Sequence, residues 1–496
     1  MKNHGNVYQT TALVTFFSVA ERALGFLYRI VLARLLGAEG LGVYQIALSH
    51  FAFFRTVGGG GLPVATARLI AKKGDDKYNG AGKILAAACF LSLCITLPLT
   101  VIPSFISTVS STLKILLIGL SFTCVYAVVK AFFWGNNQFL FPALLEIGEE
   151  IVSVVAGVLL LRFFGVNCTA VSGANLAAVA CVIACVVSCL VSLFLLLTFP
   201  KKARKLSLSK DTLKEVGGAA LPVTAMRAGS TLISSAVALI FPAMLIKAGM
   251  SSAEATAAFG VVTGMALPLL AMPMTLVGSF SLVLMPKLTE DYYQQRHERL
   301  YQNVERGLSC AVFVACLLFP FFFALGENIG LLTYENALAG EMLKNCCLLL
   351  LPMSVCMIIN TVLNSMGFER KTLLFYLIGA AAMMLCIFFL PSLLGVYAYA
   401  VGLLTQYLVS GTLGAVTLFK RRKPSRFFLR KVALAIAFTL PVLFLGQGCM
   451  QLFARFFGVL PSMALTAVCM LVANGALYLV FGLFSTSSLR KILPKR

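Results

Sequence analysis

Charged residues are scarce in this sequence. Asp, Glu, Lys and Arg make up 12% of its 496 residues, whereas soluble domains carry about 25%. Hydrophobic residues make up 60%, the mean hydropathy is +0.94, and apolar runs of about 20 residues leave no room for a large soluble domain. The short alternating segments of a membrane β-barrel are missing as well. The composition therefore predicts an all-α, polytopic membrane protein.

Metal-binding and redox motifs are equally scarce. The three histidines are scattered along the chain, which disfavours a histidine metal site. None of the 15 cysteines forms a C-x-x-C pair. Cys181, Cys185 and Cys189 repeat every four residues on one helix face, where small residues allow close packing; metal or redox chemistry is the alternative. We expect no metal and no cofactor.

Catalytic constellations are missing too. The sequence contains no Ser–His–Asp arrangement, no nucleotide-binding loop and no pair of carboxylates with a nearby histidine. ATP hydrolysis within this chain is therefore not expected. We interpret the chain as a transporter rather than an enzyme.

Acidic residues are outnumbered by basic residues, 18 to 40, which gives a formal net charge of +22. In a soluble protein this excess would favour nucleic acid. Here the basic residues cluster in short loops between apolar runs, which is the positive-inside pattern, so no nucleic acid partner is expected. The first apolar run is too long and too charged for the core of a cleavable signal peptide, so we expect the first helix to be retained.

We predict about fourteen membrane spans, with both termini in the cytoplasm. The loops that then lie in the cytoplasm hold most of the basic residues, and the opposite side holds few. The protein is therefore predicted to be a multi-pass protein of the cytoplasmic membrane. The predicted spans are 10–36, 42–71, 83–107, 113–134, 139–163, 170–199, 217–247, 254–286, 307–332, 342–366, 372–392, 395–419, 432–456 and 460–484.

A weak internal repeat divides the chain into two halves. Aligning Ala20–Ala23 with Ala225–Ala228 places Arg22 over Arg227, and the segments LLGAEGLGVYQIA and LIKAGMSSAEATAAFG that follow match loosely. Since transporters are commonly built from duplicated halves, we predict two pseudo-symmetric lobes of six helices. The predicted parts are an N-lobe (1–200), a cytoplasmic linker (201–216), a C-lobe (217–419), a basic cytoplasmic segment (420–431), a C-terminal helix pair (432–485) and a basic tail (486–496).

Arginines inside the predicted spans are the main functional signal. An ionisable side chain at membrane depth is costly and usually faces protein or a water-filled cavity. Arg22, Arg55 and Arg227 lie deep in their spans. Because arginine stays charged and its planar group pairs with phosphate through two hydrogen bonds, we predict a cavity that binds an anionic diphosphate. Structural ion pairs are the alternative.

Other charged residues accompany these arginines. Glu21 precedes Arg22, and Arg29 follows Arg22 by about two helical turns on the same face. Both Glu21 and Arg29 are predicted to line the cavity. Three further basic residues lie near span ends and are predicted to reach toward the headgroups: Arg34, Arg68 and Lys130.

Three carboxylates share one face of the predicted span 139–163: Glu146, Glu149 and Glu150. Three unpaired carboxylates would be costly in a membrane, so at least one should pair with an arginine or be protonated. Two interpretations stay open: counter-ions for the cavity arginines, or a site that couples transport to a cation or a proton. Glu146 is also close enough to the cytoplasmic end to be hydrated.

Glycines and prolines predict breaks in the helices. The second span is interrupted directly after Arg55 by Gly58, Gly59, Gly60, Gly61 and Pro63. These residues should unwind or bend the helix, and broken helices at membrane depth face protein or water. Matching bends in the second half are predicted at Pro222, Pro268 and Pro273. We interpret these positions as hinges for alternating access; kinks needed only for packing are the alternative.

Two charged loops are predicted to lie at the membrane surface. The segment 286–307 holds Tyr292, Leu300 and other apolar residues among its charges, which suggests an amphipathic surface helix. The segment 420–431, KRRKPSRFFLRK, is predicted to contact anionic lipid headgroups. A solvated run of charges without function is the alternative for each.

The ordered motifs resemble a known group of transporters, the polysaccharide-flippase branch of the MATE-like multidrug/oligosaccharidyl-lipid/polysaccharide exporter superfamily. The resemblance covers nearly the whole chain. It is carried by ERALGFLYRIVLARLLGAEGLGVYQIA, GGGGLPVATARLIA, FPALLEIGEEIVSVVAG, LPLLAMPMTLVGSFSLVLMPKLTE and LNSMGFERKT, in this order.

This resemblance implies two six-helix lobes around a central cavity that opens alternately to each side. Arg22, Arg55 and Arg227 stand at the positions of the family's cavity arginines. In some members two extra C-terminal helices form a groove toward the lipid, which would fit spans 432–456 and 460–484. The implied function is a flippase for a polyprenyl-diphosphate-linked oligosaccharide, such as a cell-wall or polysaccharide precursor. We expect a monomer, with a glycan polymerase as a candidate partner.

The energy source and two other functions stay open. Some family members bind sodium through acids in helices 7 and 11, but residues 372–419 contain no Asp or Glu and Met226 precedes Arg227. Sodium coupling through that site is therefore not expected, and coupling to the membrane potential remains open. An antiporter for drugs or cations with the same fold would need essential cavity acids. A membrane-embedded glycan polymerase or ligase would need large outer loops, which the sequence lacks.

Overall fold

The computed structural model of the chain describes residues 4–72, 80–104, 106, 109–165, 168–198, 207–420 and 422–480. Within these ranges every regular element is a helix. The all-α prediction is therefore confirmed for the described residues. The predicted tail 486–496 and the first part of the predicted linker, 201–206, lie outside them.

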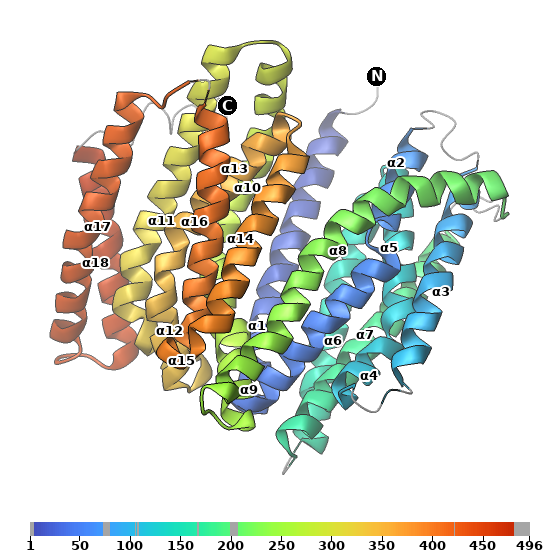
Figure 1. The fold of residues 1–496 in the computed structure, drawn as a ribbon, viewed down its shortest axis with the longest axis horizontal. Helices are drawn as coiled ribbons and strands as arrows, with labels where there is room; N and C mark the ends of the chain where they lie inside the picture. The colour runs from blue at the N-terminus through green and yellow to red at the C-terminus, as the bar shows by residue number, and fades with distance from the viewer. Residues whose placement is uncertain are drawn as a thin grey trace. The chain divides into compact units, whose positions relative to one another are not determined.

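The first of two compact units runs from Met1 to Ile246 and from Met250 to Gly260. Its cores are formed by aromatic and aliphatic side chains such as Tyr126, Phe132 and Leu116, all almost fully buried. Its helices, shown from blue to green in Figure 1, are α1 (His4–Gly59), α2 (Leu62–Ala71), α3 (Ala81–Ser104), α4 (Ser111–Ile118), α5 (Leu120–Gly135), α6 (Leu140–Phe164), α7 (Ala170–Leu196), α8 (Lys210–Lys247) and α9 (Ser252–Gly260).

The second compact unit comprises Lys247–Gly249 and the chain from Val261 onward. It begins with a π-helical turn, η2 (Val261–Ala266), and contains a short 3-10 helix, η3 (Cys347–Leu349). Its α-helices, yellow to red in Figure 1, are α10 (Leu267–Tyr293), α11 (His297–Tyr334), α12 (Ala337–Cys346), α13 (Leu350–Ser365), α14 (Glu369–Phe389), α15 (Pro391–Leu394), α16 (Tyr397–Phe419), α17 (Arg426–Phe453) and α18 (Val459–Val480).

The boundary between the units falls further along the chain than the predicted linker 201–216. From Lys210 onward this linker is part of α8, and Val216 and Ala220 of α8 are buried beside Leu62 in the core of the first unit. The seventh predicted span therefore packs with the first unit. The arrangement as two lobes of six helices stays a prediction.

The prediction of about fourteen membrane spans stays a prediction, because fewer helices of the described chain meet the length and hydropathy expected of a span. Eleven helices of the described chain are long and apolar enough to cross a membrane, or twelve if the bent pair α4–α5 forms one span. Two causes account for the difference. The first two predicted spans are one helical run, Phe16–Ala71, and α6 carries three carboxylates and Arg162.

The predicted loop between the first two spans is replaced by a kink at Gly37. Gly37 has a φ of 67° and a ψ of 179°, and helix continues on both sides. A positive φ is tolerated by glycine at no steric cost. Just beyond the kink α1 crosses α9 so closely that a Cβ at Gly42 would overlap the carbonyl of Thr256. The two segments aligned as repeats in the sequence therefore pack against each other.

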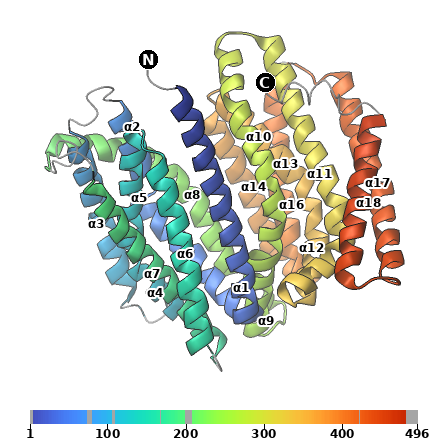
Figure 2. The ribbon, with the colours of Figure 1, turned by 180° about the vertical axis from the view of Figure 1, so that it is seen from behind.

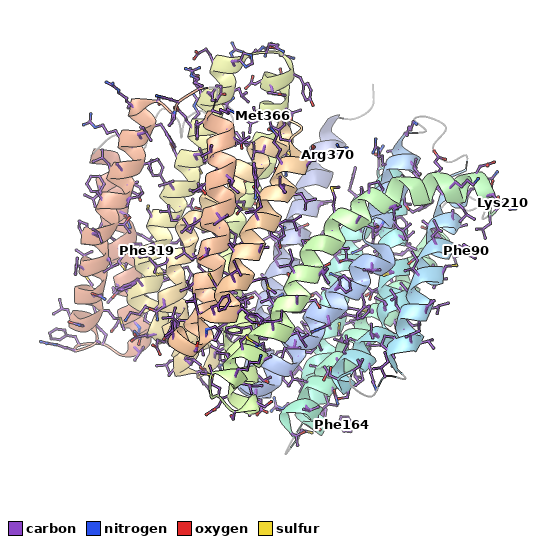
Figure 3. The ribbon with its side chains drawn as sticks, viewed as in Figure 1. Phe90, Phe164, Lys210, Phe319, Met366 and Arg370 are labelled. Atoms are coloured by element: carbon purple, nitrogen blue, oxygen red, sulfur yellow. The ribbon has the colours of Figure 1, made fainter. Side chains whose placement is uncertain are left out.

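Large apolar side chains cover the outside of the helices. Phe90 on α3 is 46% exposed and Phe164 at the end of α6 is 66% exposed (Figure 3). Many other exposed side chains are also Phe, Leu, Ile or Val. An apolar surface of this extent requires a lipid environment, as expected for a multi-pass membrane protein.

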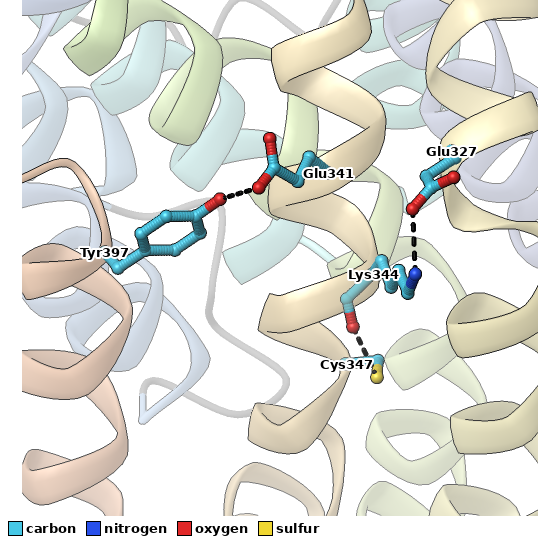
Figure 4. Close-up of polar contacts among 5 residues, drawn as sticks. All are labelled: Glu327, Glu341, Lys344, Cys347 and Tyr397. Carbon is cyan, nitrogen blue, oxygen red and sulfur yellow. Dashed lines mark hydrogen bonds and ion pairs between the residues drawn. The ribbon is translucent and has the colours of Figure 1, made fainter. Parts of the chain in front are cut away.

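Polar contacts hold one corner of the second unit, where α11, α12 and α16 meet (Figure 4). The Lys344 ammonium lies 2.8 Å from the carboxylate of Glu327, and the Cys347 thiol donates to the carbonyl of Lys344 over 2.8 Å. The Tyr397 hydroxyl donates to the carboxylate of Glu341. These contacts join the last turn of α12 to α11 through Lys344 and the start of α16 to α12 through Tyr397.

The C-terminal helix pair packs on α11, as Figures 1 and 2 both show. Phe313 and Val312 of α11 form a buried cluster with Ala435 of α17 and Tyr478 of α18. α17 already begins at Arg426, so only the first half of the predicted basic segment 420–431 precedes the helix. The start of α17 is hydrogen-bonded to α11: the Glu305 carboxylate of α11 accepts from the amide and the hydroxyl of Ser425, each over 2.7 Å.

The prediction of an amphipathic surface helix at 286–307 is wrong. The segment is a hairpin in which α10 ends at Tyr293 and α11 begins at His297. The predicted apolar face is buried in protein: Leu300, Tyr301 and Val304 are at most 9% exposed. These apolar side chains therefore pack against neighbouring helices and not against lipid, as a surface helix would require.

Candidate functional site

The helix break predicted after Arg55 is present in the first unit. α1 ends at Gly59 and α2 begins at Leu62, with Pro63 in its first turn. The two intervening residues are Gly60 and Gly61. A break at membrane depth leaves backbone groups that require partners, since each unsatisfied group is costly there.

Helix α8 supplies these partners. The Gly61 amide donates to the hydroxyl of Thr224 over 3.0 Å. One guanidinium nitrogen of Arg227, Nη1, donates to the carbonyl of Gly60 over 2.9 Å. A Cβ at Gly61 would overlap the carbonyl oxygen of Ala220, so only glycine permits this approach. The break and α8 therefore form one structural element.

A cavity of about 270 Å³ lies beside the break, within the first unit. We call it the arginine cavity. Three cationic side chains line it, Arg55, Lys130 and Arg227, against one carboxylate, Glu149. The other lining residues are Thr56, Gly59, Gly60, Pro63, Thr123, Cys124, Tyr126 and Ala127. The lining charges are therefore predominantly positive.

Lys130 is held in place by two contacts. Its ammonium lies 3.1 Å from the carboxylate of Glu146, and the two side chains are 16% and 24% exposed. The same ammonium lies 4.4 Å from the ring centroid of Tyr126. The prediction that Lys130 reaches toward the headgroups is therefore wrong. Because a charge at this depth is costly, the ion pair is favoured over the headgroups.

The three carboxylates of α6 have different surroundings. Glu146 pairs with Lys130, a lysine and not one of the expected arginines. Glu149 lines the arginine cavity. The Glu150 carboxylate packs against Gly25 of α1, with Oε1 3.0 Å from the point where a Cβ would stand. One face of α6 thus serves both the cavity and the contact with α1.

Three charged residues of α1 that were predicted to line the cavity are not among the residues that line it. Arg22 and Arg29 are exposed and Glu21 is half-buried, and none of the three is among the cavity-lining residues. Glu21 lies within electrostatic range of Glu146 and Lys130. Their predicted role in substrate binding stays a prediction.

The predicted hinge prolines have unequal structural effects. Pro63 begins α2 directly after the break. Pro222 lies within α8, which is described as one helix from Lys210 to Lys247. Pro268 follows the π-helical turn η2, and Pro273 lies inside α10. The break at Gly60–Gly61 is therefore observed, whereas movement about any of these positions stays a prediction.

Sequence reasoning missed the cavity roles of Lys130, Tyr126 and Thr123 on α5. One signal could have revealed Lys130: antiparallel helices joined by a short turn bring residues at equal distance from the turn side by side. Lys130 and Glu146 lie equally far from Gln138, in the turn between α5 and α6. The hydrogen bond of Thr224 to the break had no signal in the sequence.

The donors that line the arginine cavity suit an anion. Two guanidinium groups and one ammonium line it and present several N–H donors for charge-assisted hydrogen bonds. Among the described residues, no group of three or more His, Cys, Asp and Glu could hold a metal ion. The chemistry offered is therefore electrostatic binding and hydrogen bonding.

Comparisons with known sequences place this arrangement in a family. The family model described as "Polysaccharide biosynthesis protein" matches residues 7–291, more than half of the chain. Stage V sporulation protein B of Bacillus subtilis (strain 168) is 26% identical over 511 aligned residues, which cover 97% of this chain and 96% of that protein. Lipid II flippase MurJ of the same organism is 23% identical over 337 residues, 61% of each chain.

Solved structures show the same fold. The inward closed conformation of lipid II flippase MurJ has a TM-score of 0.74 at 15% identity, and the match covers 95% of this chain and 99% of that one. An inward-facing multidrug resistance MATE family transporter of the MOP superfamily has a TM-score of 0.67 at 16% identity, covering 81% and 96%. With a helical membrane fold and a family match over more than half its length, this chain belongs to the polysaccharide biosynthesis protein family and is a multi-pass membrane protein.

Proposed function

We propose that this protein is a flippase that moves a polyprenyl-diphosphate-linked oligosaccharide across the cytoplasmic membrane by alternating access. The observation that carries the proposal is the arginine cavity, where Arg55, Arg227 and Lys130 outnumber the single carboxylate of Glu149. A diphosphate bears the charge and the acceptor oxygens that such a cavity favours. Membership of the family and the relatives named as a sporulation protein and a lipid II flippase support the same substrate class.

In this mechanism the diphosphate enters the arginine cavity from the cytoplasmic leaflet. The guanidinium of Arg55 forms no hydrogen bond to another described residue, so it can bind phosphate. Arg227 donates one N–H to the Gly60 carbonyl, and its other N–H groups can bind phosphate. The polyprenyl tail stays in lipid. The break at Gly60–Gly61 provides the bend through which the cavity changes its opening.

The first test is transport by the full chain in vesicles that contain a lipid diphosphate-linked sugar. An enzyme added outside reports how much sugar has crossed. Charge-assisted hydrogen bonds are strong, so we expect Arg55→Ala and Arg227→Ala each to lower the transport rate about tenfold or more. The matched control is Arg162→Ala, since Arg162 is exposed near the end of α6 and does not line the cavity.

Transport equal to wild type in well-folded Arg55→Ala and Arg227→Ala proteins would contradict the role of the cavity. Because Arg227 also holds the Gly60 carbonyl, its variant is checked for thermal unfolding. The side chain of Arg55 forms no hydrogen bond to another described residue. A loss of transport in Arg55→Ala therefore reports lost binding and not lost folding.

An antiporter for drugs or cations is the second candidate, and Glu149 favours it. Glu149 is the one carboxylate that lines the arginine cavity, and the fold matches that of a multidrug resistance transporter. This function predicts efflux of a cationic dye that Glu149→Gln abolishes, with no movement of the lipid-linked sugar. Sugar transport that survives Glu149→Gln, without dye efflux, assigns the cavity to the diphosphate.

A further inference from the structure

The hairpin between α10 and α11 extends well beyond the apolar part of its helices. α11 has 38 residues, so it is about 57 Å long, against a hydrocarbon core of about 30 Å. In Figures 1 and 2 the hairpin projects past the ends of α14 and α16 in the same unit. The charged residues of 287–306 therefore lie in the headgroup region or the water beside it.

One face of this hairpin is hollowed into a pocket of about 410 Å³, which we call the hairpin pocket. Its lining is polar and contains four basic residues, two acidic residues and two amides. The lining residues are Lys287, Glu290, Asp291, Arg296, Arg299, Gln302, Asn303 and Arg306. Leu288, Leu300 and Val304 are buried, so the pocket rests on a packed base.

Each of the four acidic residues in 287–306 already has a partner. Within the pocket, the Glu290 carboxylate pairs with Arg296 over 3.3 Å, and Asp291 accepts from the side-chain amide of Asn303 over 2.8 Å. The other two acids hold the start of α17. Glu298 pairs with Arg422 over 2.7 Å, and Glu305 accepts from Ser425.

Three cations of the hairpin pocket have no acidic partner among the described residues: Lys287, Arg299 and Arg306. Arg306 is oriented by a chain of contacts. Its Nη1 lies 3.5 Å from Oδ1 of Asn303, and Nδ2 of Asn303 donates to the carboxylate of Asp291, which is 6% exposed. Arg299 and Arg306 are seven residues apart, two helical turns, so both point from one face of α11. The pocket thus holds cations without acidic partners on a rigid base.

We infer that the hairpin pocket is a binding site for a phosphate group, separate from the arginine cavity. Two arginines and a lysine suit phosphate, since guanidinium donates two parallel hydrogen bonds and ammonium adds a point charge. The phosphate of an anionic lipid headgroup is one source, and a soluble phosphate is the other. The hairpin extends beyond the apolar part of its helices, on the side predicted to hold most basic loops, and this favours the lipid.

The test measures binding by the full chain in neutral detergent, without transport, so it stands whether or not the protein is a flippase. Native mass spectrometry records bound phosphatidylglycerol, with phosphatidylcholine as the neutral-headgroup comparison. Inorganic phosphate is titrated by calorimetry in a second arm. The variant is Arg299→Gln/Arg306→Gln, and the matched control is Arg370→Gln, an exposed arginine outside the pocket (Figure 3).

We expect phosphatidylglycerol to bind in preference to phosphatidylcholine and its affinity to fall about tenfold or more in the double glutamine variant. Arg370→Gln should bind like wild type. The charge-retaining variant Arg299→Lys/Arg306→Lys should keep most of the binding, which separates lost charge from lost fold. Inorganic phosphate that binds with the same dependence on Arg299 and Arg306, without preference among lipids, supports the site with a soluble ligand.

Two results would overturn the site. One is that neither phosphatidylglycerol nor inorganic phosphate shows saturable binding that depends on Arg299 and Arg306. The other is an equal loss in Arg370→Gln, which would show attraction by the general positive charge of the protein and not by the pocket.

Discussion

A single ion pair, Lys130 with Glu146, shapes the cationic wall of the arginine cavity. Its two side chains are 16% and 24% exposed and come from adjacent helices, α5 and α6. The pair keeps the ammonium beside Tyr126 and so keeps one cation in the cavity. The ion pair therefore serves to position Lys130 as much as to stabilise the fold, because a buried ion pair often adds little stability over two apolar side chains.

This balance predicts the stability of two variants. Lys130→Met leaves Glu146 without its partner in a poorly hydrated place, which should lower the free energy of unfolding by roughly 1–3 kcal/mol. Lys130→Met/Glu146→Met removes both charges and should be more stable than the single variant. Thermal unfolding in detergent measures both. A double variant less stable than the single variant would contradict the description of this pair as partly buried.

Prediction from sequence at the scale of residues succeeded in part. Arg55 and Arg227 stand out because arginine in an apolar run needs a polar surrounding, and the structure does place both at one cavity. Lys130 was missed because its nearness to a span end suggested the headgroups. The short turn between its helix and α6, which places it opposite Glu146, decides otherwise.

At the scale of elements, the broken helix α1–α2 depends on α8. Three contacts join them: the bond of Gly61 to Thr224, the bond of Arg227 to the Gly60 carbonyl, and the close approach of Gly61 to Ala220. The sequence predicts that the glycines break the helix. It does not predict that Gly61 also leaves room for the close approach of α8. Close approach is a property of two elements and not of one.

Gly61→Ala should therefore destabilise the protein. A methyl group at this position meets the carbonyl oxygen of Ala220 and the hydroxyl of Thr224, and forced overpacking costs typically about 1–3 kcal/mol. The matched control is Gly218→Ala, also at a glycine, since a Cβ on Gly218 of α8 meets nothing within 4 Å. We expect the control to be neutral or slightly more stable, because alanine favours helix.

Unfolding temperature and transport are measured together for this pair of variants. A Gly61→Ala protein as stable as Gly218→Ala would show that α8 does not approach the break as described. If Gly61→Ala is less stable but transports at the normal rate per folded molecule, the break is a packing feature and not a hinge.

At the scale of the whole molecule, the orientation in the membrane is still a prediction. The basic residues place the α10–α11 hairpin in the cytoplasm and the turn around α15 outside. Tyr293 at the hairpin is 68% exposed and Leu393 in α15 is 80% exposed. Cysteines introduced at these two positions should therefore be accessible from opposite sides.

An impermeant thiol reagent applied to intact cells should label Leu393→Cys, while Tyr293→Cys should react only after the membrane is opened. The wild type, with its 15 native cysteines, is the blank. The reverse pattern would place the termini outside, and it would also move the hairpin pocket away from the leaflet that favours its lipid ligand.

The sequence by itself determined the broad character of this protein. A chain that is 60% hydrophobic and 12% charged indicates a membrane protein. Its long apolar runs, without the alternating segments of a barrel, indicate helices, because only helices and closed barrels satisfy their backbone in lipid. The ordered motifs were enough to indicate the family, which the match to residues 7–291 shows. The glycines after Arg55 were enough to locate the break, since backbone preference is a local property.

Only the tertiary structure decided which side chains meet. It paired Lys130 with Glu146, set Arg227 against the Gly60 carbonyl, and left Arg22 and Arg29 outside the arginine cavity. It buried the apolar face of the α10–α11 hairpin in protein and gave each acid of the hairpin a partner other than Arg299 or Arg306, which left these two arginines around a pocket. The physical reason is that ion pairs and cavities depend on how distant helices pack, and lipid and protein interiors offer an apolar side chain nearly the same environment.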